Sequence, residues 1–427
     1  MQNQLHLMES AQVKWNKKKI LVYLTILVNI LSLIPNIGIV ANATAPSLIQ
    51  QYSIQELINT ANNGTTLIIQ PGIYRDSITI NKTLKILGEN KSTTIIQGNA
   101  TDVVKITANN VYFSGFTVRN GICGVNLTAS SCTVTGNIFY NNSFGIASDS
   151  AINNTIIGNV LINNTRLAIG SGILLNDRSN QNSIIGNTII NSGEAVYVRN
   201  SDNNTIARNF MRNNYRTGVC LMIGETSADY NRIYDNVIIE GAVYGIDLYS
   251  AKHNIIFNNT LENNGQGFEI ENSKNNTFYR NNIISSWKGM YLLGSRNNTF
   301  YQNNIVDNYI QIGGDNSVSG WDNGFDGNYW SDYTGTDANH DGIGETSHFL
   351  YSNNTDYYPL MKPYMEGDAN HDGKIDIKDA SLIGIAWNAT KGAISYNPHA
   401  DLNTDNTINV ADAEIIRENW QQTYKLP

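Results

Sequence analysis

Charged residues are scarce in this chain of 427 residues, where Asp, Glu, Lys and Arg together make up 15%. The formal net charge is −8, and the part after residue 45 is more acidic still, because residues 1–45 hold more Lys than Glu. Nucleic acids attract basic surfaces, so this balance argues against DNA or RNA as a partner. An acidic chain of this kind suits an exterior rich in calcium.

Cysteines are also few. Cys123 and Cys132 are expected on successive passes of the chain and could pair, which would leave Cys220 over. The favoured alternative is burial of all three as small hydrophobic side chains. No spacing of Cys and His matches a zinc site.

The 3.6-residue periodicity of long helices is missing from the middle of the chain, and a longer repeat takes its place. The stretch Asn275–Ile284 recurs 22 residues later as Asn297–Val306. Asparagines at one phase of each copy are separated by 22, 28, 22, 27, 23, 22 and 22 residues. They are Asn137, Asn159, Asn187, Asn209, Asn236, Asn259, Asn281 and Asn303. A fixed period of this length indicates a solenoid.

Each repeat holds short runs with apolar residues at alternate positions, such as Thr155–Ile157 and Gly245–Leu248. This alternation indicates strands, and the Asn-Asn, Asn-Gly and Ser-Gly breaks favour tight turns. Three short strands in a 22-residue turn predict an all-β parallel β-helix. The repeated Asn is expected to stack from turn to turn through its side-chain amide.

The N-terminal segment has the features of a secretory signal peptide. A basic stretch, Lys14–Lys19, precedes the apolar run Ile20–Ile34, and Ala43–Ala45 fits a cleavage site. The alternative is an uncleaved membrane anchor. We therefore assign residues 1–45 to a signal peptide or anchor and expect a secreted or cell-surface protein.

Residues 46–320 are assigned to the β-helix. Ser53–Ala61 has apolar residues at helical spacing and is expected to cover the first open turn. The segments Ile68–Tyr74, Ile78–Ile80 and Leu84–Gly88 resemble the opening of right-handed parallel β-helix families. These families include pectate-lyase-like proteins and the NosD-type proteins of the carbohydrate-binding and sugar hydrolase (CASH) group. The resemblance covers residues 50–363 and implies a right-handed, pectin-lyase-like solenoid; the group includes lyases, hydrolases and non-enzymes.

Two repeats are longer than the others, around Arg166–Ser171 and Tyr215–Ser227. We expect both insertions at one corner of the solenoid, where they mark a binding side or are simply tolerated.

Aligned strands beside that corner predict one outward strip of polar and aromatic side chains. Asp247, Glu269 and Glu271 are the candidate catalytic carboxylates. Stacking at about 4.8 Å places Asp247 roughly 5 Å from Glu269 and nearer 8 Å from Glu271, spacings that suit retaining and inverting glycosidases respectively. The alternatives are noncatalytic glycan binding and a merely solvated face. Candidate substrate-binding residues are Tyr197, Arg199, Tyr249 and Tyr291.

Residues 321–363 resemble the C-terminal cap of NosD-type helices and are expected to close the last turn through Trp321, Phe325, Tyr329 and Trp330. The resemblance implies a link to copper delivery, but His253, His340 and His348 form no evident copper cluster. Within the cap, Gly342 marks the sharp turn of a possible calcium loop. Its oxygen ligands would be Asp337, Asn339, Asp341 and Glu345.

Two loops near the C-terminus have the ligand spacing of calcium loops, and each is followed by an apolar helix, predicted over Ala380–Trp387 and Ala413–Trp420. The first set of ligands is Asp368, Asn370, Asp372, the carbonyl of Lys374, Asp376 and Asp379. The second, 33 residues later, is Asp401, Asn403, Asp405, Thr407, Asn409 and Asp412.

This duplicated pattern over residues 366–422 resembles a dockerin, a calcium-binding domain that docks onto cohesin modules. The alternative is a calcium-stabilised tail without a partner. The resemblance implies two bound Ca²⁺ ions and a cohesin-bearing scaffold or surface protein as partner. It places Lys378, Ser381, Ala411 and Glu414 near the recognition surface.

The sequence therefore predicts a secreted, calcium-dependent β-helix protein that binds or processes polysaccharide or cell-surface glycan and is tethered by a dockerin. If it is an enzyme, it is a glycoside hydrolase or a lyase. The alternatives are a noncatalytic surface or adhesion protein and, more distantly, a copper accessory protein. Asn-x-Ser/Thr sequons from Asn42 to Asn388 make glycosylation plausible, although the repeat itself generates many of them.

Overall fold

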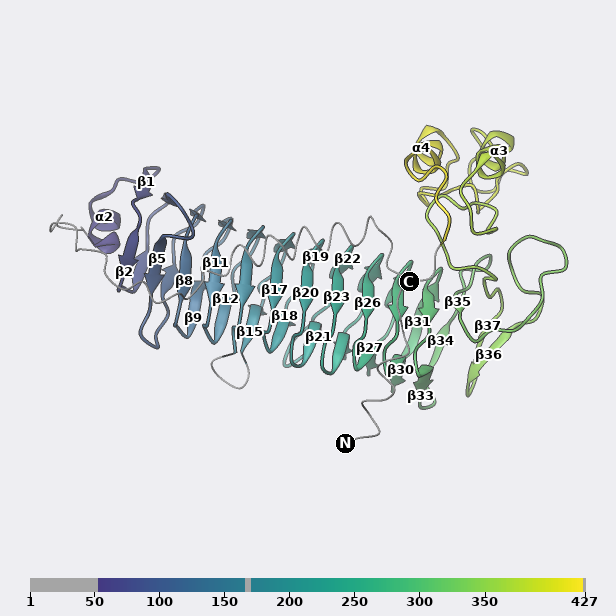
Figure 1. Cartoon of the computed structure of the whole chain (residues 1–427), viewed down its shortest axis with the longest axis horizontal. Coiled ribbons are helices and arrows are strands. Elements are labelled where there is room, and N and C mark those ends of the chain that lie inside the picture. Colours follow the sequence, from purple (N-terminus) through teal and green to yellow (C-terminus); the bar gives the residue numbers. More distant parts are fainter. Residues whose placement is uncertain (1–52, 166–169, 425–427) are drawn as a thin grey trace, which may run out of the picture.

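A computed structural model describes residues 53–165 and 170–424 of the chain. The predicted signal peptide or anchor, residues 1–45, lies outside this part. Figure 1 shows an elongated solenoid with helix α2 (Ile54–Thr60) at one end and helices α3 (Ile377–Ile385) and α4 (Val410–Glu418) beside the other. Across these two ranges, no helix is long and apolar enough to span a membrane.

The predicted right-handed parallel β-helix is confirmed. Each turn contributes one strand to each of three parallel sheets, two of 12 strands and one of 11. Sheet A contains β1 (Thr66–Ile69), β4 (Lys85–Gly88), β7 (Tyr112–Ser114), β10 (Thr133–Thr135), β13 (Thr155–Ile157), β16 (Ser183–Ile185), β19 (Thr205–Ala207), β22 (Arg232–Tyr234), β25 (Ile255–Phe257), β28 (Thr277–Tyr279), β31 (Arg296–Tyr301) and β34 (Val318–Gly320).

The other two sheets are built in the same way. Sheet B contains β2 (Gly72–Tyr74), β5 (Thr94–Gln97), β8 (Thr117–Arg119), β11 (Ile138–Tyr140), β14 (Val160–Ile162), β17 (Thr188–Ile190), β20 (Phe210–Arg212), β23 (Val237–Ile239), β26 (Thr260–Glu262), β29 (Asn282–Ile284), β32 (Asn304–Val306) and β35 (Tyr329–Trp330). Sheet C contains β3 (Ile78–Ile80), β6 (Val104–Ile106), β9 (Cys123–Leu127), β12 (Phe144–Asp149), β15 (Ser171–Asn176), β18 (Glu194–Arg199), β21 (Thr217–Met222), β24 (Tyr244–Tyr249), β27 (Gln266–Glu271), β30 (Lys288–Leu293) and β33 (Ile310–Gly314).

The core is a stack of the inward residues of these short strands. Ile184, Ile206, Ile233 and Ile256 are register partners on successive turns of sheet A, and all are fully buried. A side chain that fills the interior of one turn thus packs on the equivalent side chain of the next. The alternation seen in the sequence is therefore the alternation between core and surface.

Buried asparagines form ladders at the corners, as predicted. The Asn159 backbone N–H and side-chain amide both donate to Oδ1 of Asn187, at 3.0 and 3.1 Å. The Asn187 amide also donates to the carbonyl of Ile156, so the ladder satisfies buried backbone groups where the strands end. The ladder continues beyond Asn303 to Asn328, one turn further than the repeat indicated.

Both ends of the solenoid are covered. Helix α2 begins with a capping box between Ser53 and Glu56, and it buries Ile54 and Ile58. At the other end, Trp321 stacks on Phe300 with ring centroids 4.4 Å apart, and Trp330 is equally buried.

Several sequence-based expectations about the solenoid are corrected. Phe325 is 49% exposed and does not close the last turn. Strand β35 belongs to sheet B although it lies in the segment assigned to the cap. The three cysteines are buried and unpaired, so the Cys123–Cys132 pairing is wrong and their burial is confirmed.

The two insertions do not share a corner. The first falls between β14 and β15, before sheet C, and includes residues 166–169, which lie outside the described part. The second falls mostly between β21 and β22, after sheet C. The prediction was wrong because the Asn spacing gives the length of a turn but not the corner that holds its extra residues.

The C-terminal helices begin earlier than predicted. Helix α3 starts at Ile377 because Asp376 is its N-cap and Asp379 completes a capping box. Helix α4 starts at Val410 through the same arrangement of Asn409 and Asp412. The last residues of each predicted calcium loop therefore also form the first turn of the helix that follows.

Candidate functional site

The predicted strip lies on the outer face of sheet C, and its columns are real register partners. Tyr197, Cys220, Asp247, Glu269 and Tyr291 are aligned on successive strands from β18 to β30. A second row places Arg199, Met222, Tyr249, Glu271 and Leu293 side by side. The inward residues between the two rows are fully buried, as Leu248 and Ile270 show.

A third row was missed because the alternation between inward and outward residues breaks at the second residue of each strand, which is glycine in most strands and Ala195 in β18. In β27, Gly267 and Phe268 are both buried, so Gln266 faces outward three residues before Glu269. A Cβ on Gly267 would lie 2.4 Å from Ile283 Cγ2 and 2.6 Å from the Gly289 carbonyl oxygen, which explains the glycine. The same phase holds Glu194, Thr217, Tyr244, Gln266 and Lys288. Reading outward residues at both i and i+3 around each glycine would have found this row.

Glu269 is not a freely solvated outward side chain. Its exposed fraction is 8%, and its Oε2 has no protein hydrogen-bond partner. Burial and the neighbouring Asp247 raise the pKa of Glu269 to about 7, although Lys288 opposes the shift. Strong pKa shifts of this kind are concentrated at functional sites.

Asp247 lies beside Glu269 on the preceding turn. Burial raises the pKa of Asp247 to about 6, and the charge of Glu271 acts in the same direction. The thiol of Cys220 donates to Asp247 Oδ2 at 3.7 Å, and burial raises the pKa of that thiol well above its usual value. Near neutral pH the two neighbouring carboxyls, both with raised pKa values, thus share a proton that the pair gives up and takes back readily.

The predicted sugar-binding residues surround the pair unevenly. Tyr291 is the register partner of Glu269, and Tyr249 is the register partner of Glu271, two residues after Asp247 on β24. Lys288 Nζ lies 4.0 Å from the Tyr291 ring centroid. Tyr197 is further along the strip and donates to the sulfur of Met222 at 3.1 Å. Arg199 is exposed beside the second insertion, at Gly224.

An ion pair flanks the strip. Glu194 is buried, accepts a hydrogen bond from Ser171 at 3.0 Å, and lies 3.0 Å from Arg216. Arg216 lowers the pKa of Asp247 through its charge. Neither residue was singled out from the sequence. Glu194 belongs to the missed third row, and Arg216 belongs to the loop just before β21.

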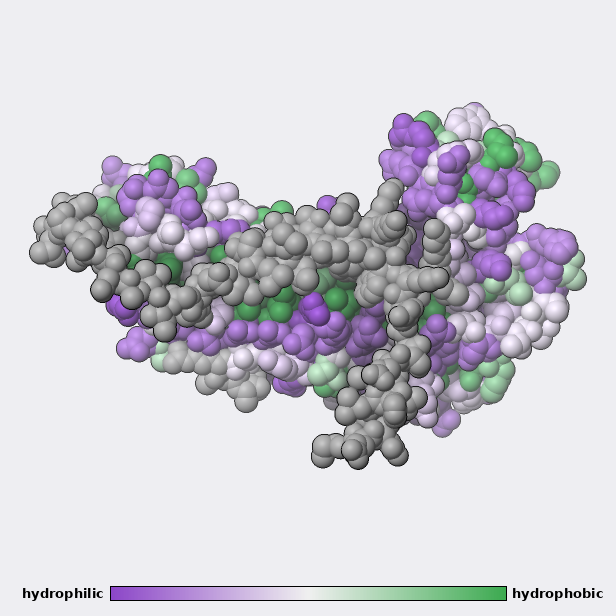
Figure 2. Space-filling model, in the orientation of Figure 1, coloured by the Kyte–Doolittle hydropathy of each residue, from purple (hydrophilic) through white to green (hydrophobic). Residues whose placement is uncertain are grey.

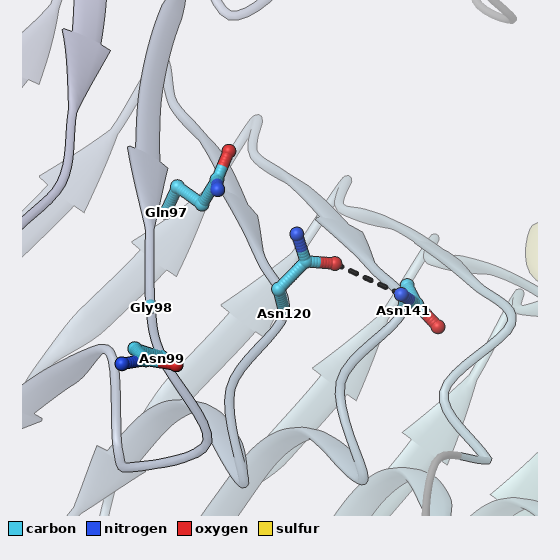
Figure 3. A pocket seen from close by; sticks show the side chains of 5 residues that line it. All are labelled: Gln97, Gly98, Asn99, Asn120 and Asn141. Atoms are coloured by element: carbon cyan, nitrogen blue, oxygen red, sulfur yellow. Dashed lines mark hydrogen bonds between the residues drawn. The ribbon is translucent and has the colours of Figure 1, made fainter.

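Two other surfaces carry polar or aromatic residues without comparable chemistry. Tyr234, Phe257, Tyr279 and Tyr301 stack on one another on sheet A at 4.8–5.2 Å. Their ring faces are occupied by each other, so the ladder is a structural feature. Figure 3 shows a recess at the end of β5, where the amides of Asn120 and Asn141 are hydrogen-bonded at 2.8 Å. Its lining residues include no carboxylate: Gln97, Gly98, Asn99, Asn120 and Asn141.

In both predicted C-terminal calcium loops, backbone N–H groups hold the carboxylate of the first predicted ligand in place. In the first loop, the amides of Asp372 and Gly373 donate to the two carboxylate oxygens of Asp368 at 3.2 and 2.8 Å. In the second, the amides of Asp405 and Asn406 donate to Asp401 in the same way, at 3.1 and 2.9 Å. Gly373 and Asn406 adopt φ of +82° and +69°, so the replacement of glycine by asparagine keeps the turn.

The charge of these loops fits a bound cation. Asp368, Asp379, Asp401 and Asp412 are all buried, at most 5% exposed. Burial raises the pKa of Asp368 to about 6, and the charges of Asp379 and Asp372 raise it further. Converging carboxylate and amide oxygens are the donor set that Ca²⁺ prefers.

The cap loop repeats this arrangement. The amides of Asp341 and Gly342 donate to Asp337 at 3.1 and 3.0 Å, and Gly342 has φ of +82°. Glu345 accepts from the amides of Ala338 and Asn339, at 2.6 and 3.1 Å. In the first C-terminal loop the position-twelve Asp379 accepts from Asn370 in the same manner. Glu345 at position nine therefore takes the place of the missing twelfth-position carboxylate.

An exposed apolar surface lies beside the predicted partner residues. Ile377, Ser381 and Ile385 are spaced by four residues on α3, and the two isoleucines are 67% and 79% exposed. Hydrophobic surface gathers over α3 in Figure 2. Lys378, Ser381 and Glu414 are exposed and Ala411 is half-buried. Val410, 61% exposed, occupies on α4 the position of Ile377 on α3.

The three histidines considered for copper do not come together. His253 stacks on Tyr230, and His348 lies 3.7 Å from Asp332. Over residues 53–165 and 170–424, three side chains of the His, Cys, Asp or Glu type bring their ligand atoms within 4.8 Å of one another at one place, Asp326, His371 and His399.

Comparison with protein families agrees with the two parts of the chain. Residues 161–306 match the right-handed beta helix region, and residues 366–419 match the dockerin type I domain. The narrower NosD-type assignment is not confirmed. A cell surface glycoprotein of Methanothermus fervidus is 32% identical over 93 residues. The match covers 21% of this chain and spans 15% of that relative.

Solved structures share the fold at low sequence identity. The catalytic domain of an alpha-1,3-glucanase in complex with nigerose has a TM-score of 0.51 and 14% identity, over 66% of this chain and 71% of that one. The Dettilon tailspike protein has a TM-score of 0.47 and 16% identity, over 58% of this chain and 57% of that one. At 14% identity, the likeness to the glucanase domain concerns the fold alone.

Proposed function

We propose that this chain, a right-handed parallel β-helix with a dockerin type I domain, is a polysaccharide-active protein of the cell exterior. Its site is the outer face of sheet C around Asp247 and Glu269. The observation that carries the proposal is that these two carboxyls are register partners, that Glu269 is buried and Asp247 half-buried, and that both have raised pKa values, of about 7 and about 6.

A carboxyl pair of this kind matches the chemistry of glycoside hydrolysis. Glu269, with the higher pKa, would be the general acid, and Asp247 the nucleophile or base. Adjacent strands of a sheet are about 4.8 Å apart, which suits a retaining reaction for this pair. The diagonal pair Asp247–Glu271 is wider and would suit an inverting one. The alpha-1,3-glucanase with the same fold supports a sugar substrate by analogy only.

The rings beside the pair would hold the sugar chain. Tyr249 and Tyr291 provide apolar surface for sugar faces, while Arg199 and the free edge of Glu271 provide polar contacts to hydroxyls. Tyr197 would extend the contact along the strip. We expect each Tyr→Ala change at Tyr249 or Tyr291 to weaken glycan binding by about 1 kcal/mol or more.

A noncatalytic glycan-binding surface is the second candidate. It is favoured by the position of Lys288, which partly neutralises Glu269 and covers one face of the Tyr291 ring. A strip of this kind would bind without turnover, as an adhesion protein does. If the protein is an enzyme, a lyase is recognised by its unsaturated products, whereas a hydrolase releases reducing ends without unsaturation.

The two candidates are distinguished by one set of assays. A panel of polysaccharides is incubated with the full chain, and both reducing ends and unsaturated products are measured. We expect Glu269→Gln to lose turnover while it retains binding, and Asp149→Asn, an exposed change on the same sheet, to alter neither. If the wild type binds a glycan without turning it over, and amide replacement of Asp247, Glu269 and Glu271 abolishes that binding, the noncatalytic surface is supported. If wild type and the Asp247, Glu269 and Glu271 triple amide variant bind alike without turnover, the site assignment is wrong.

The dockerin region would tether the protein to a cohesin-bearing scaffold or surface protein. We propose that the α3 face formed by Ile377, Ser381 and Ile385, together with Lys378, contacts the partner, with Ala411 and Glu414 on α4 in the equivalent place. Two Ca²⁺ ions in the C-terminal loops support this surface, and a third would bind in the cap loop at Asp337, Asn339, Asp341 and Glu345. Location outside the cell follows from this tether and from the predicted signal peptide.

A further inference from the structure

The dockerin region is fixed to the flank of the solenoid by polar contacts. Arg280, at the end of β28, donates to the Leu402 carbonyl at 2.9 Å. Asn304 exchanges two hydrogen bonds with the backbone of Tyr364, at 3.1 and 2.7 Å. Figure 1 shows α3 and α4 beside the last turns of the solenoid.

A buried cluster of three metal-type ligands lies at this junction. Asp326 Oδ1 is 3.1 Å from His371 Nε2 and 3.1 Å from His399 Nε2. The side chains of Asp326 and His371 are 4% and 5% exposed, and that of His399 is 23% exposed. All three ligand atoms lie within 4.8 Å of one another. Asp326 comes from the cap, whereas the histidines come from two separate loops of the dockerin region.

Hydrogen bonding alone leaves this cluster incomplete. Gln302 donates to the other oxygen of Asp326 at 2.7 Å, which turns Oδ1 toward the imidazoles. Nε2 of His371 forms a hydrogen bond with Oδ1. Nε2 of His399 is buried 3.1 Å from the same oxygen but does not have the geometry of a hydrogen bond to it. Two imidazole nitrogens therefore converge on one carboxylate oxygen, and the His399 nitrogen lacks the well-formed hydrogen bond that buried polar atoms usually have. A ligand shared by the three side chains would satisfy it.

The donor set matches a transition metal and not calcium. Two imidazole nitrogens and one carboxylate oxygen are typical ligands of zinc, whereas calcium takes six to eight oxygens. Zinc bond lengths near 2.0–2.2 Å and tetrahedral angles require ligand atoms roughly 3.3 Å apart, close to the 3.1 Å from Asp326 to each histidine. A cavity of about 40 Å³ adjoins the three side chains and has room for one water as a fourth ligand.

We propose that Asp326, His371 and His399 bind one zinc-class divalent ion that fixes the dockerin region to the end of the solenoid. The ligands belong to both parts, so the ion links their relative orientation to metal availability. The calcium loops and this cluster would then hold chemically distinct ions. The proposal is independent of the glycan activity.

The test uses the full chain in excess Ca²⁺, so that the dockerin loops keep their own ion. Zn²⁺ is titrated by calorimetry, and the zinc retained after desalting is measured by elemental analysis. We expect one Zn²⁺ per wild-type chain and a loss of at least tenfold in affinity for His399→Ala and for Asp326→Asn. His253→Ala, a change at a histidine stacked on Tyr230, serves as the matched control and should bind as wild type does.

Two further measurements make the result decisive. Co²⁺ in place of Zn²⁺ should give the visible absorption of a four- or five-coordinate ion in wild type and not in His399→Ala. Circular dichroism confirms that each variant is folded, and His399→Gln replaces His399→Ala if it is not. Absence of zinc binding, or zinc binding unchanged in both His399 and Asp326 variants, would overturn the proposal and leave a hydrogen-bonded cluster only.

Discussion

At the scale of single residues, the buried asparagines link one turn to the next. Asn281 is fully buried, donates to the Ile256 carbonyl at 2.9 Å, and accepts from the backbone and side chain of Asn259 at 3.0 and 2.9 Å. Backbone groups at the corners have no partner in the β-ladders, so they need the hydrogen bonds that the asparagine supplies. An apolar side chain at this position could not form them.

Asn281→Ala is expected to destabilise the solenoid strongly. The change removes the Asn281 partner of the Asn259 backbone N–H and of the Ile256 carbonyl, at a cost of about 1–3 kcal/mol for each buried group. The Asn259 side-chain amide keeps its bonds to the carbonyls of Ile233 and Phe257. Urea denaturation should show a clearly lower midpoint, while Thr277→Ala, at a half-buried outward position on β28, should change it little. Equal midpoints for the two variants would show that the ladder does not stabilise the fold.

Glu269 makes the stability of the solenoid depend on pH. Its pKa in the folded chain is raised from 4.5 to about 7, so the protonated form is favoured by folding. The stabilisation is complete below about pH 4.5 and is lost as the pH rises to 7, with a slope of at most about 1.4 kcal/mol per pH unit for one proton.

The variant that removes this dependence is Glu269→Gln. Unfolding free energies measured from pH 5 to pH 8 with Ca²⁺ present should fall less in the variant than in wild type, by about 1–2 kcal/mol. Buried Asp356, whose pKa is also raised to about 7, titrates in both proteins and therefore cancels. Parallel pH curves would mean that Glu269 is solvated in solution.

At the scale of elements, helices α3 and α4 depend on the loops before them. Their N-caps, Asp376 and Asn409, are loop residues, and Asp379 and Asp412 are fully buried in their first turns. The apolar core of this region is small. Its largest aliphatic members are Ile375, Ile383, Leu402, Ile408 and Ile416. Small domains with so little apolar core are commonly stabilised by a bound metal, and we predict that calcium does so in this region.

Removal of calcium should therefore unfold α3 and α4 and leave the β-helix intact. In the full chain, EGTA should abolish the helical circular dichroism, and proteases should then cut only beyond about residue 361. Ca²⁺ alone should restore both properties in wild type but not in Asp368→Ala or Asp401→Ala. Helical signal and protease resistance that persist in EGTA would refute the dependence.

At the scale of the whole molecule, Arg280 holds the two parts together. Its side chain is 13% exposed, bonds to the Leu402 carbonyl and Gln302, lies 3.7 Å from Glu366, and stands over the Tyr364 ring. Arg208 occupies the same phase of an earlier turn and has nearly the same φ. Its side chain is 67% exposed and lies 3.7 Å from Asp235.

Arg280→Asn should release the dockerin region without unfolding either part, because Asn tolerates the φ of +56° that Arg280 adopts. Small-angle scattering with Ca²⁺ present and zinc chelated should show a larger radius of gyration, and cleavage between residues 361 and 367 should be faster. Arg208→Asn provides the matched control and should behave as wild type. A radius unchanged in Arg280→Asn would show that other contacts suffice.

The sequence by itself determined everything that depends on local repetition. The 22-residue period, the inward apolar positions, the Asn ladder and the registers of Asp247, Glu269 and Glu271 follow because each turn packs only on its neighbours. The calcium loops of the dockerin region are equally local, since one short segment supplies their ligands.

The tertiary structure alone decided what depends on contacts between distant segments. It buried Glu269 between neighbouring turns and brought Lys288 and Glu194 into the strip where the alternation of the sheet C strands breaks. It placed one insertion before a strand of sheet C and most of the other after one. It also joined Asp326 to His371 and His399, 45 and 73 residues away in the sequence. A ligand set assembled across two packed domains has no fixed spacing along the chain, so spacing rules cannot find it.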